Sequence, residues 1–378
     1  MKKEEKISLL QDIIRIKSEN GNEAEVANFI EKILKKYGIE SKIVPYSNGR
    51  SNLVATISNG KGKTLGLTGH MDVVAAGESS DWLYPPYEAH IDGNKMYGRG
   101  TTDMKSGLMA MVIAMIELKE QGVPINGTIK LLATVGEEVG ELGSEQLTQQ
   151  GYVDDINGLI IGEPTNYNLM YTHMGSINYK VTSYGKAAHS SMPELGINAI
   201  NHLNNFIAIV NEKMTDVTAK YKNDILGRTI HSVTTIQGGT QVNSIPNEAS
   251  LQGNIRSIPE FSNDQVIALL ENIINKLNKK EQYNMKLEIQ YNKIPVKADE
   301  KSDLIQAIQS QFSKTLPLVS SAGTTDAAEF TKSKHPFDFV VFGPGVSNKA
   351  HQINEYVEID NYIDMIDKYQ SIAKTYLI

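Results

Sequence analysis

Residues 65–72 read LGLTGHMD, a short apolar run that ends at a glycine and is followed by two polar side chains. The run has the composition of a buried β-strand, so we expect His70 and Asp72 where that strand ends. Residues two apart on an extended backbone point to the same side, which places an imidazole beside a carboxylate. A metal-ligating histidine needs such a neighbour, because a carboxylate at its second ring nitrogen fixes the tautomer. Taken alone, the pattern is also that of a strand end with two polar loop residues.

The composition limits the classes of protein that the chain can belong to. The chain has 378 residues, of which 40% are hydrophobic and 21% charged, as in a globular protein of two domains. A net charge of −7, spread along the chain, argues against nucleic acid or a membrane surface as its partner. No apolar run could span a bilayer and no signal-peptide pattern is present, so the expected location is cytoplasmic. Because the chain has no cysteine, His, Asp and Glu would have to hold any metal, which suits zinc, cobalt or manganese.

Strands and helices alternate in the first and last parts of the chain. The expected helices cover 4–18, 22–37, 105–118, 197–214, 263–278, 300–312 and 359–375, and a further helix is expected to open at 323–326. The main expected strands cover 39–44, 52–57, 64–67, 128–135, 158–161, 176–184, 230–237, 248–256, 285–291 and 337–342. The alternation predicts an α/β fold with a mostly parallel sheet flanked by helices. Between 176 and 292 the order changes to a self-contained β-α-β-β-α-β unit. We therefore expect a discontinuous metal-binding domain over 1–175 and 293–378, with an inserted domain over 176–292.

Five polar residues fall at strand ends or in loops of the discontinuous domain. They are His70, Asp103, Glu138, Glu163 and His351. Two imidazoles and three carboxylates are the donor set of a hydrolase that uses two metal ions. Glu137, next to a ligand but not needed as one, is then the natural general base for the attacking water. Each residue has a plainer alternative, such as a solvated acidic turn for Glu137 and Glu138, and it is their combination that favours the metal site.

Several separated motifs resemble those of the M20 family of dinuclear-zinc amidohydrolases and peptidases. They are TGHMD at 68–72, GRGTTDMK at 98–105, GEE at 136–138, GEPT at 162–165, GKAAHS at 185–190, and the loop that holds His351. The resemblance runs nearly end to end, and GEPT with a compact inserted domain favours the succinyl-diaminopimelate desuccinylase and acetylornithine deacetylase branch. It implies hydrolysis of the amide bond of an N-acyl amino acid. A di- or aminoacyl-peptidase, or an enzyme similar to glutamate carboxypeptidase, is the alternative within the family.

The resemblance also implies a role for each residue of the cluster. Two divalent ions per subunit, zinc first and otherwise cobalt or manganese, would be held by His70 and Glu163, by Glu138 and His351, and by Asp103 as the bridge. Asp72 would orient His70, and Glu137 would take a proton from the attacking water and return it to the leaving amine.

Further residues enter through the inserted domain, which by the same resemblance is a lid and the contact of a homodimer. His189 would reach the active site of the other subunit and stabilise the oxyanion there. Arg256 would clamp the carboxylate of an N-acyl amino acid or dipeptide substrate, and Asn243 and the turn at Gly323 and Thr324 would assist. From the residues alone, His189 could instead cap its own turn, and Arg256 could pair with a surface acid.

Two readings from other classes are weaker. A non-catalytic binding protein on the same fold would be expected to lack a ligand or the base, whereas this chain keeps all of them. A Ser-His-Asp hydrolase would be expected to contain a Gly-x-Ser-x-Gly turn, and the sequence has none.

Overall fold

The chain divides into two compact units. The computed structural model describes residues 1–58, 60, 62–122 and 126–377. Unit 1 comprises Met1–Tyr171, Ala298–Val319 and Thr325–Ile378, and unit 2 comprises Thr172–Lys297 and Ser320–Thr324. The short stretch with Gly323 and Thr324 thus groups with unit 2, whereas the sequence places it in the metal-binding domain.

Unit 1 is built around a mixed sheet whose central strands are parallel. Its strands are β1 (Glu40–Ser47), β2 (Arg50–Ser58), β3 (Lys63–His70), β6 (Gly127–Thr134), β7 (Gly158–Pro164), β8 (Leu169–His173) and β17 (Asp338–Gly343), in the order β1-β2-β6-β3-β7-β17-β8. The neighbours β6, β3, β7 and β17 run parallel, and the outer pairs are antiparallel. Two further strands, β15 (Val296–Lys297) and β16 (Leu318–Ser321), pair with β8, and β15 does so at Thr172 and His173, which already belong to unit 2. The expected α/β class with a mostly parallel central sheet is confirmed.

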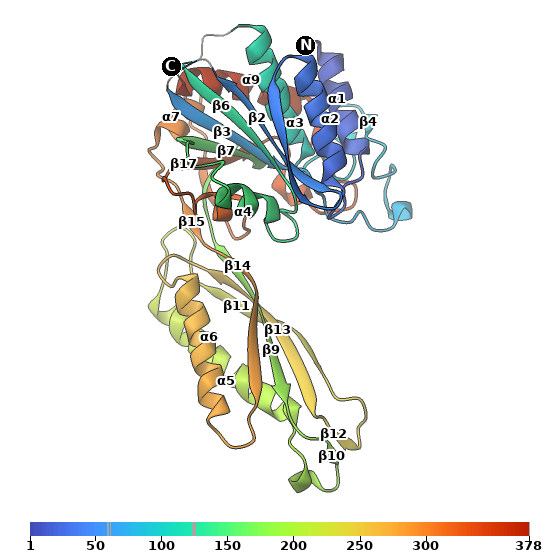
Figure 1. Ribbon diagram of the computed structural model, residues 1–378, viewed down its shortest axis with the longest axis vertical. Helices are drawn as coiled ribbons and strands as arrows, with labels where there is room; N and C mark the ends of the chain where they lie inside the picture. The colour runs from blue at the N-terminus through green and yellow to red at the C-terminus, as the bar shows by residue number, and fades with distance from the viewer. Residues whose placement is uncertain (59, 61, 123–125, 378) are drawn as a thin grey trace. The chain divides into compact units, whose positions relative to one another are not determined.

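Helices flank this sheet (Figure 1). The helices of unit 1 are α1 (Lys3–Arg15), α2 (Glu23–Lys36), α3 (Lys105–Glu120), α4 (Leu142–Gln149), α7 (Asp303–Gln309), α8 (Ala327–Phe330) and α9 (Ile359–Tyr376). Every residue of α3 from Lys105 to Leu118 is buried, as its apolar composition requires, because an all-round apolar helix has no face to offer to water. Smaller elements are η1 (Ser79–Asp81), η3 (Ser347–Lys349) and the sheet formed by β18 (Tyr356–Glu358), β5 (Lys95–Tyr97) and β4 (His90–Asp92).

Unit 2 is an antiparallel sheet with two helices packed on one face, as Figure 1 shows. Its main elements are β9 (Gly175–Tyr184), α5 (Ala199–Lys220), β11 (Ile230–Gly238), β13 (Glu248–Ser257), α6 (Asn263–Asn278) and β14 (Met285–Lys293), with sheet order β11-β13-β9-β14. Buried and less buried residues alternate along β13, since one face of the sheet meets the helices. A short antiparallel pair, β10 (Ala188–His189) and β12 (Ser244–Ile245), and η2 (Pro193–Leu195) complete the unit.

Long, strongly periodic segments are where sequence and structure agree best. The helix expected over 263–278 has those bounds as α6, and it begins with a capping box in which Ser262 and Gln265 exchange hydrogen bonds. The helix expected over 300–312 is shorter, and the one expected to open after Gly323 is only Ala327–Phe330. Among the described residues, no helix combines the length and apolar composition needed to cross a bilayer.

Candidate metal centre

The candidate ligands lie at one edge of the sheet of unit 1. His70 is the last residue of β3, Glu163 lies near the end of β7, and Glu138 follows the end of β6 by four residues. Because these strands are parallel, their carboxyl ends meet at the same edge. Asp103 comes just before α3, and His351 lies in the loop after β17.

Asp103 lies between the two imidazoles, with one carboxylate oxygen directed at each. His70 Nε2 is 3.0 Å from Asp103 Oδ1, and His351 Nε2 is 3.3 Å from Asp103 Oδ2. Each imidazole has a second carboxylate partner, at 3.4 Å for His70 with Glu163 and 2.9 Å for His351 with Glu138. The five residues therefore form two His–carboxylate groups joined through Asp103.

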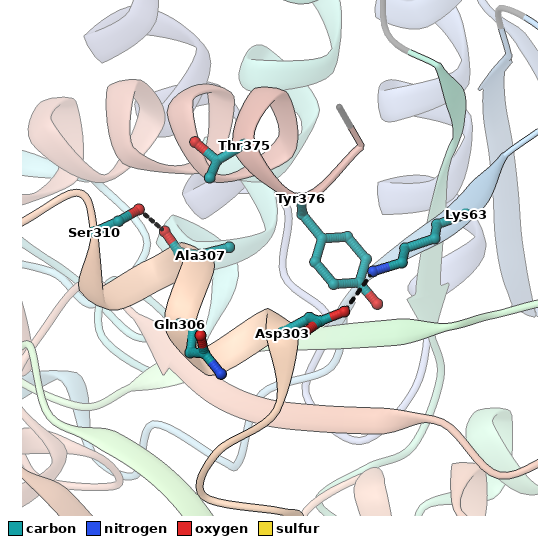
Figure 2. A pocket seen from close by; sticks show the side chains of 7 residues that line it. All are labelled: Lys63, Asp303, Gln306, Ala307, Ser310, Thr375 and Tyr376. Carbon is teal, nitrogen blue, oxygen red and sulfur yellow. Dashed lines mark hydrogen bonds and ion pairs between the residues drawn. The ribbon is translucent and has the colours of Figure 1, made fainter.

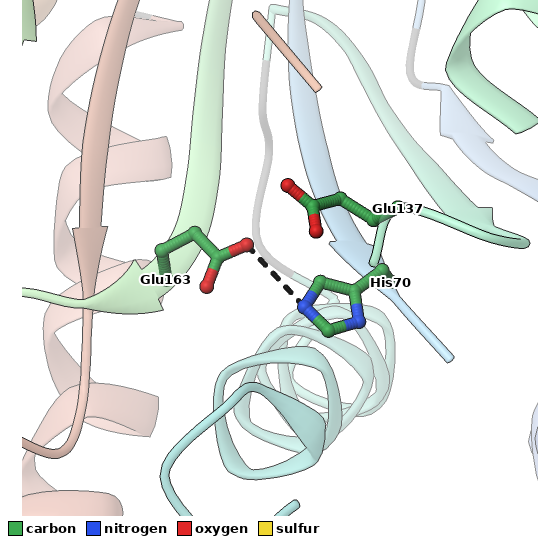
Figure 3. Close-up of side chains that lie close together, drawn as sticks. All are labelled: His70, Glu137 and Glu163. Atoms are coloured by element: carbon green, nitrogen blue, oxygen red, sulfur yellow. Dashed lines mark ion pairs between the residues drawn. The ribbon is translucent and has the colours of Figure 1, made fainter. Parts of the chain in front are cut away.

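Glu137 faces the His70 half of this cluster. In Figure 3 the side chains of His70, Glu137 and Glu163 point toward one another. His70 comes from β3, Glu137 from the loop that follows β6, and Glu163 from β7. The ligand atoms of His70, Glu137 and Glu163 all lie within 4.8 Å of one another. The same is true of the ligand atoms of His70, Asp103 and Glu138. Glu137 is thus as close to the cluster as the expected ligands are.

Asp72 contacts His70 through its main chain more closely than through its carboxylate. His70 Nδ1 is 2.9 Å from the carbonyl oxygen of Asp72 and 3.6 Å from its carboxylate. The Asp72 carboxylate instead accepts the backbone N–H groups of Glu137 and Glu138, at 3.1 Å each. The residue therefore sets the orientation of the imidazole and also holds the loop that carries Glu137.

Burial and neighbouring charges shift the pKa values of the residues in the cluster. Burial raises the pKa of Glu137 and of Glu163 well above the ordinary value, and neighbouring carboxylates reinforce the effect. Burial alone would lower the pKa of His70, but Glu163, Asp103 and Asp72 reverse this and raise it. Hydrogen bonds to Asp103 and Glu138 raise the pKa of His351 to about 10.

These residues fit divalent metal ions. The donor atoms are imidazole nitrogens and carboxylate oxygens, which zinc, cobalt and manganese accept. The cluster also gathers carboxylates that are largely removed from water, where nearby positive charge would stabilise them. A shared carboxylate between two His–carboxylate groups is the arrangement that a pair of ions needs.

The remaining predicted residues belong to unit 2 and lie at three places. His189 on β10 pairs with Ser244 on β12, and Asn243 accepts the backbone N–H of Ser190 at 3.0 Å, so His189 and Asn243 lie together. Arg256 lies near the far end of β13, about 25 Å along that strand from its start. Thr324 Oγ1 is 3.2 Å from the hydroxyl of Tyr291, and Gly323 donates its backbone N–H to Ser321.

Two features beside the cluster have roles that the sequence did not reveal. Asp326 is buried and accepts the hydroxyls of Thr134 at 2.7 Å and Ser144 at 2.6 Å, so it holds both flanks of the loop with Glu137. Arg99 and Glu355 form a buried ion pair at 2.6 Å. Both Arg99 and Asp326 stand in motif-like stretches, but nothing in the sequence indicates what they contact.

A hollow of about 350 Å³ in unit 1 lies apart from the candidate metal centre (Figure 2). Lys63 at its rim makes an ion pair of 2.7 Å with Asp303 and lies 4.8 Å above the ring centre of Tyr376. Lys63 is the first residue of β3 and His70 is the last, so the hollow lies about 23 Å from the ligands along that strand. It is not part of the metal centre.

Comparisons with known proteins identify the family of the chain. Residues 66–375 match the family model described as peptidase family M20/M25/M40. A protein of Staphylococcus aureus strain MSSA476 named "probable succinyl-diaminopimelate desuccinylase" is 42% identical over 402 residues, which cover 99% of this chain and 98% of that protein.

Solved structures give the same fold. An M20 family metallo-carboxypeptidase of Sulfolobus solfataricus superposes with a TM-score of 0.83 at 21% identity, covering 98% of this chain and 99% of that one. A dinuclear metal binding peptidase from the M20 family of Bacillus subtilis superposes with a TM-score of 0.74 at 15% identity, covering 99% and 98%. The resemblance seen in the motifs is thereby confirmed, and this chain belongs to peptidase family M20/M25/M40.

Proposed function

We propose that this protein hydrolyses the amide bond of an N-acyl amino acid, with succinyl-diaminopimelate as its substrate and succinate and diaminopimelate as products. The single observation that carries the hydrolytic chemistry is Asp103, whose two carboxylate oxygens face His70 and His351. The choice of substrate rests on full-length similarity to the S. aureus relative named above. Acetylornithine and dipeptides are the competing substrates.

The proposed metal ligands are the five residues of the cluster. His70 and Glu163 would hold one divalent ion, Glu138 and His351 the other, and Asp103 would bridge them. We propose zinc as the metal, with cobalt or manganese able to replace it, because the donors are nitrogen and oxygen atoms. Such ions supply Lewis-acid chemistry, since they polarise a carbonyl group and make water a stronger acid.

Glu137 is the proposed general base. Its carboxylate takes a proton from water, the water oxygen bonds to the substrate carbonyl carbon, and the C–N bond then breaks as Glu137 passes the proton to the amine nitrogen. Asp72 keeps Glu137 in place by accepting its backbone N–H. The buried setting helps, because a carboxylate screened from water holds a proton more readily.

The test of this function is Glu137→Gln, measured for activity and for metal content. We expect about two metal ions per chain in both proteins, and a kcat lower by about 10²- to 10⁴-fold in the variant. Glu145→Gln is the matched control, because Glu145 lies in α4, outside the cluster, and contacts Gln149. A wild-type protein without metal, or a variant as active as wild type, would contradict the proposal.

The substrate is tested separately. Hydrolysis of succinyl-diaminopimelate, acetylornithine and a dipeptide panel is compared by kcat/KM with the same metal-loaded protein. We expect succinyl-diaminopimelate to give the highest value. A higher value for a dipeptide would assign the protein to the peptidases of the family instead.

We further propose that unit 2 is a lid and a dimerisation domain, and that His189 acts on the substrate bound by the other subunit. Arg256, Asn243, Gly323 and Thr324 are the proposed substrate-binding residues. The length of β13 supports the trans arrangement: about 25 Å separates the end of unit 2 that carries Arg256 from the end with His189 and Asn243. One small substrate is too short to contact both ends of the same unit.

A further inference from the structure

Arg99 and Glu355 form an ion pair that is sealed from water inside unit 1. Arg99 Nη1 is 2.6 Å from Glu355 Oε2, and the two residues are 2% and 0% exposed. A buried ion pair is costly to form, because both charges lose their hydration. The pair lies between two candidate ligands, Asp103 and His351.

Glu355 holds the backbone at Asp103. Its Oε1 accepts the N–H of Thr102 at 2.8 Å and that of Asp103 at 3.0 Å. The hydroxyl of Thr102 also donates to the carbonyl of Tyr356, the residue after Glu355. The main chain of the bridging residue is therefore attached to the segment at 355–356.

Arg99 holds the loop that carries His351. Its guanidinium donates to the carbonyl oxygens of Gln352 at 3.3 Å and His351 at 3.4 Å. It also lies 5.2 Å above the ring centre of Trp82, which restricts where the guanidinium can move. The pair thus connects Asp103 on one side with His351 on the other.

The two halves of the metal centre are held by different means. His70 ends β3 and pairs with Thr134, and Glu163 lies in β7, so the sheet fixes both. His351 lies in a loop, has a backbone φ of +62°, and its side chain is 52% exposed. Its position relative to Asp103 therefore depends on side-chain contacts and not on a strand ladder.

We propose that Arg99 and Glu355 are positioning residues that hold Asp103 and His351 at the separation required by the ion on the His351–Glu138 side. Loss of the pair lowers the affinity for that ion and leaves the affinity for the ion on the His70–Glu163 side unchanged. The proposal rests on the two-metal function proposed above. Neither residue touches the metal or the substrate in this role, because both act through Asp103 and His351.

The experiment compares Glu355→Gln with Glu117→Gln. Glu117 is the matched control because it also belongs to a buried ion pair of unit 1, accepting Lys6 at 2.9 Å and Gln370 at 2.7 Å, but contacts no candidate ligand. Zinc-loaded proteins are dialysed and their zinc per chain is measured. We expect about two ions in wild type and Glu117→Gln, and about one in Glu355→Gln, with the affinity for the second ion lower by about 10- to 100-fold.

Two further measurements separate positioning from folding. Arg99→Lys keeps the charge but loses the planar donor fork, so we expect it to lose the second ion while its metal-free Tm stays near that of Glu117→Gln. The rise in Tm on adding zinc should be smaller for Glu355→Gln than for the control.

The outcomes are distinct. If Glu355→Gln and Arg99→Lys bind two ions with wild-type affinity, or if Glu117→Gln loses zinc equally, the positioning role is wrong. If wild type itself binds no zinc, cobalt or manganese, the two-metal function fails and the positioning role fails with it.

Discussion

The side chain of His173 is fully buried at the end of β8, and its charge state follows from that burial. Its Nδ1 lies 2.8 Å from the carbonyl oxygen of Met174, and its Nε2 has no hydrogen-bond partner in the part of the chain that the structure describes. Burial, with Arg256 nearby, lowers the pKa of His173 to about 4. The folded protein therefore keeps this imidazole neutral where the unfolded chain would protonate it.

This shift predicts a loss of stability on acidification. Between the ordinary pKa of about 6.5 and the folded value of about 4, the unfolded chain binds a proton that the folded protein does not, so the free energy of unfolding falls as the pH falls. Between pH 7 and pH 5 the expected loss from this residue is about 2 kcal/mol. Urea unfolding at the two pH values measures it.

The matched variants are His173→Asn, which can keep the hydrogen bond made by Nδ1, and His335→Asn at an exposed position. We expect the first to remove this part of the pH dependence and the second to retain it. An unchanged pH dependence in His173→Asn would show that the imidazole is not the group responsible.

Among the secondary-structure elements, α3 and β7 approach each other so closely that only glycine fits between them. A Cβ atom added at Gly107 would lie 2.0 Å from the carbonyl oxygen of Gly162. Asp103 comes just before α3, and Glu163 follows Gly162, so this contact also sets how near these two candidate ligands lie.

We expect Gly107→Ala to lower the free energy of unfolding by about 3 kcal/mol, because the helix must move off the strand. We also expect the zinc content to fall below that of wild type, since Asp103 moves with the helix. Ser106→Ala is the control on the same helix: the hydroxyl of Ser106 is buried and has no partner among the described residues. Denaturant unfolding and metal analysis of both variants test this, and equal effects would contradict it.

For the whole molecule, the free edge of unit 2 is the feature that bears on assembly. β11 is an outer strand of that sheet, and its apolar side chains Ile230 and Ile236 are 52% and 55% exposed. An exposed apolar edge strand is a template for pairing with another chain. Pairing two copies along β11 would form the dimer that the proposed role of His189 requires.

We expect Ile236→Lys to convert the protein to a monomer in analytical ultracentrifugation and to reduce kcat in parallel, because charge at the edge opposes strand pairing. Tyr46→Lys, at another exposed apolar side chain but in unit 1, should leave both properties unchanged. A monomer with full activity would exclude the trans role of His189, and a monomeric wild type would exclude the dimer.

The main elements and the chemistry of the candidate centre can be predicted from local sequence patterns. Period and composition are local properties, so they located long elements such as α6 and β9, and they identified the strand that ends at His70. Short elements carried too few residues for a pattern, and α4 and β8 were not predicted. The M20 motifs identified the family, because each is a local run of residues.

How these residues meet is a property of the folded chain. The contacts that place one oxygen of Asp103 on each imidazole, and those that tie Arg99 to Glu355, join segments as far as 256 residues apart. The tertiary structure also shows that Asp72 reaches His70 with its main-chain carbonyl, while its carboxylate holds the loop of Glu137. Such contacts depend on how the sheet brings strand ends and loops together, and local sequence patterns do not encode that arrangement.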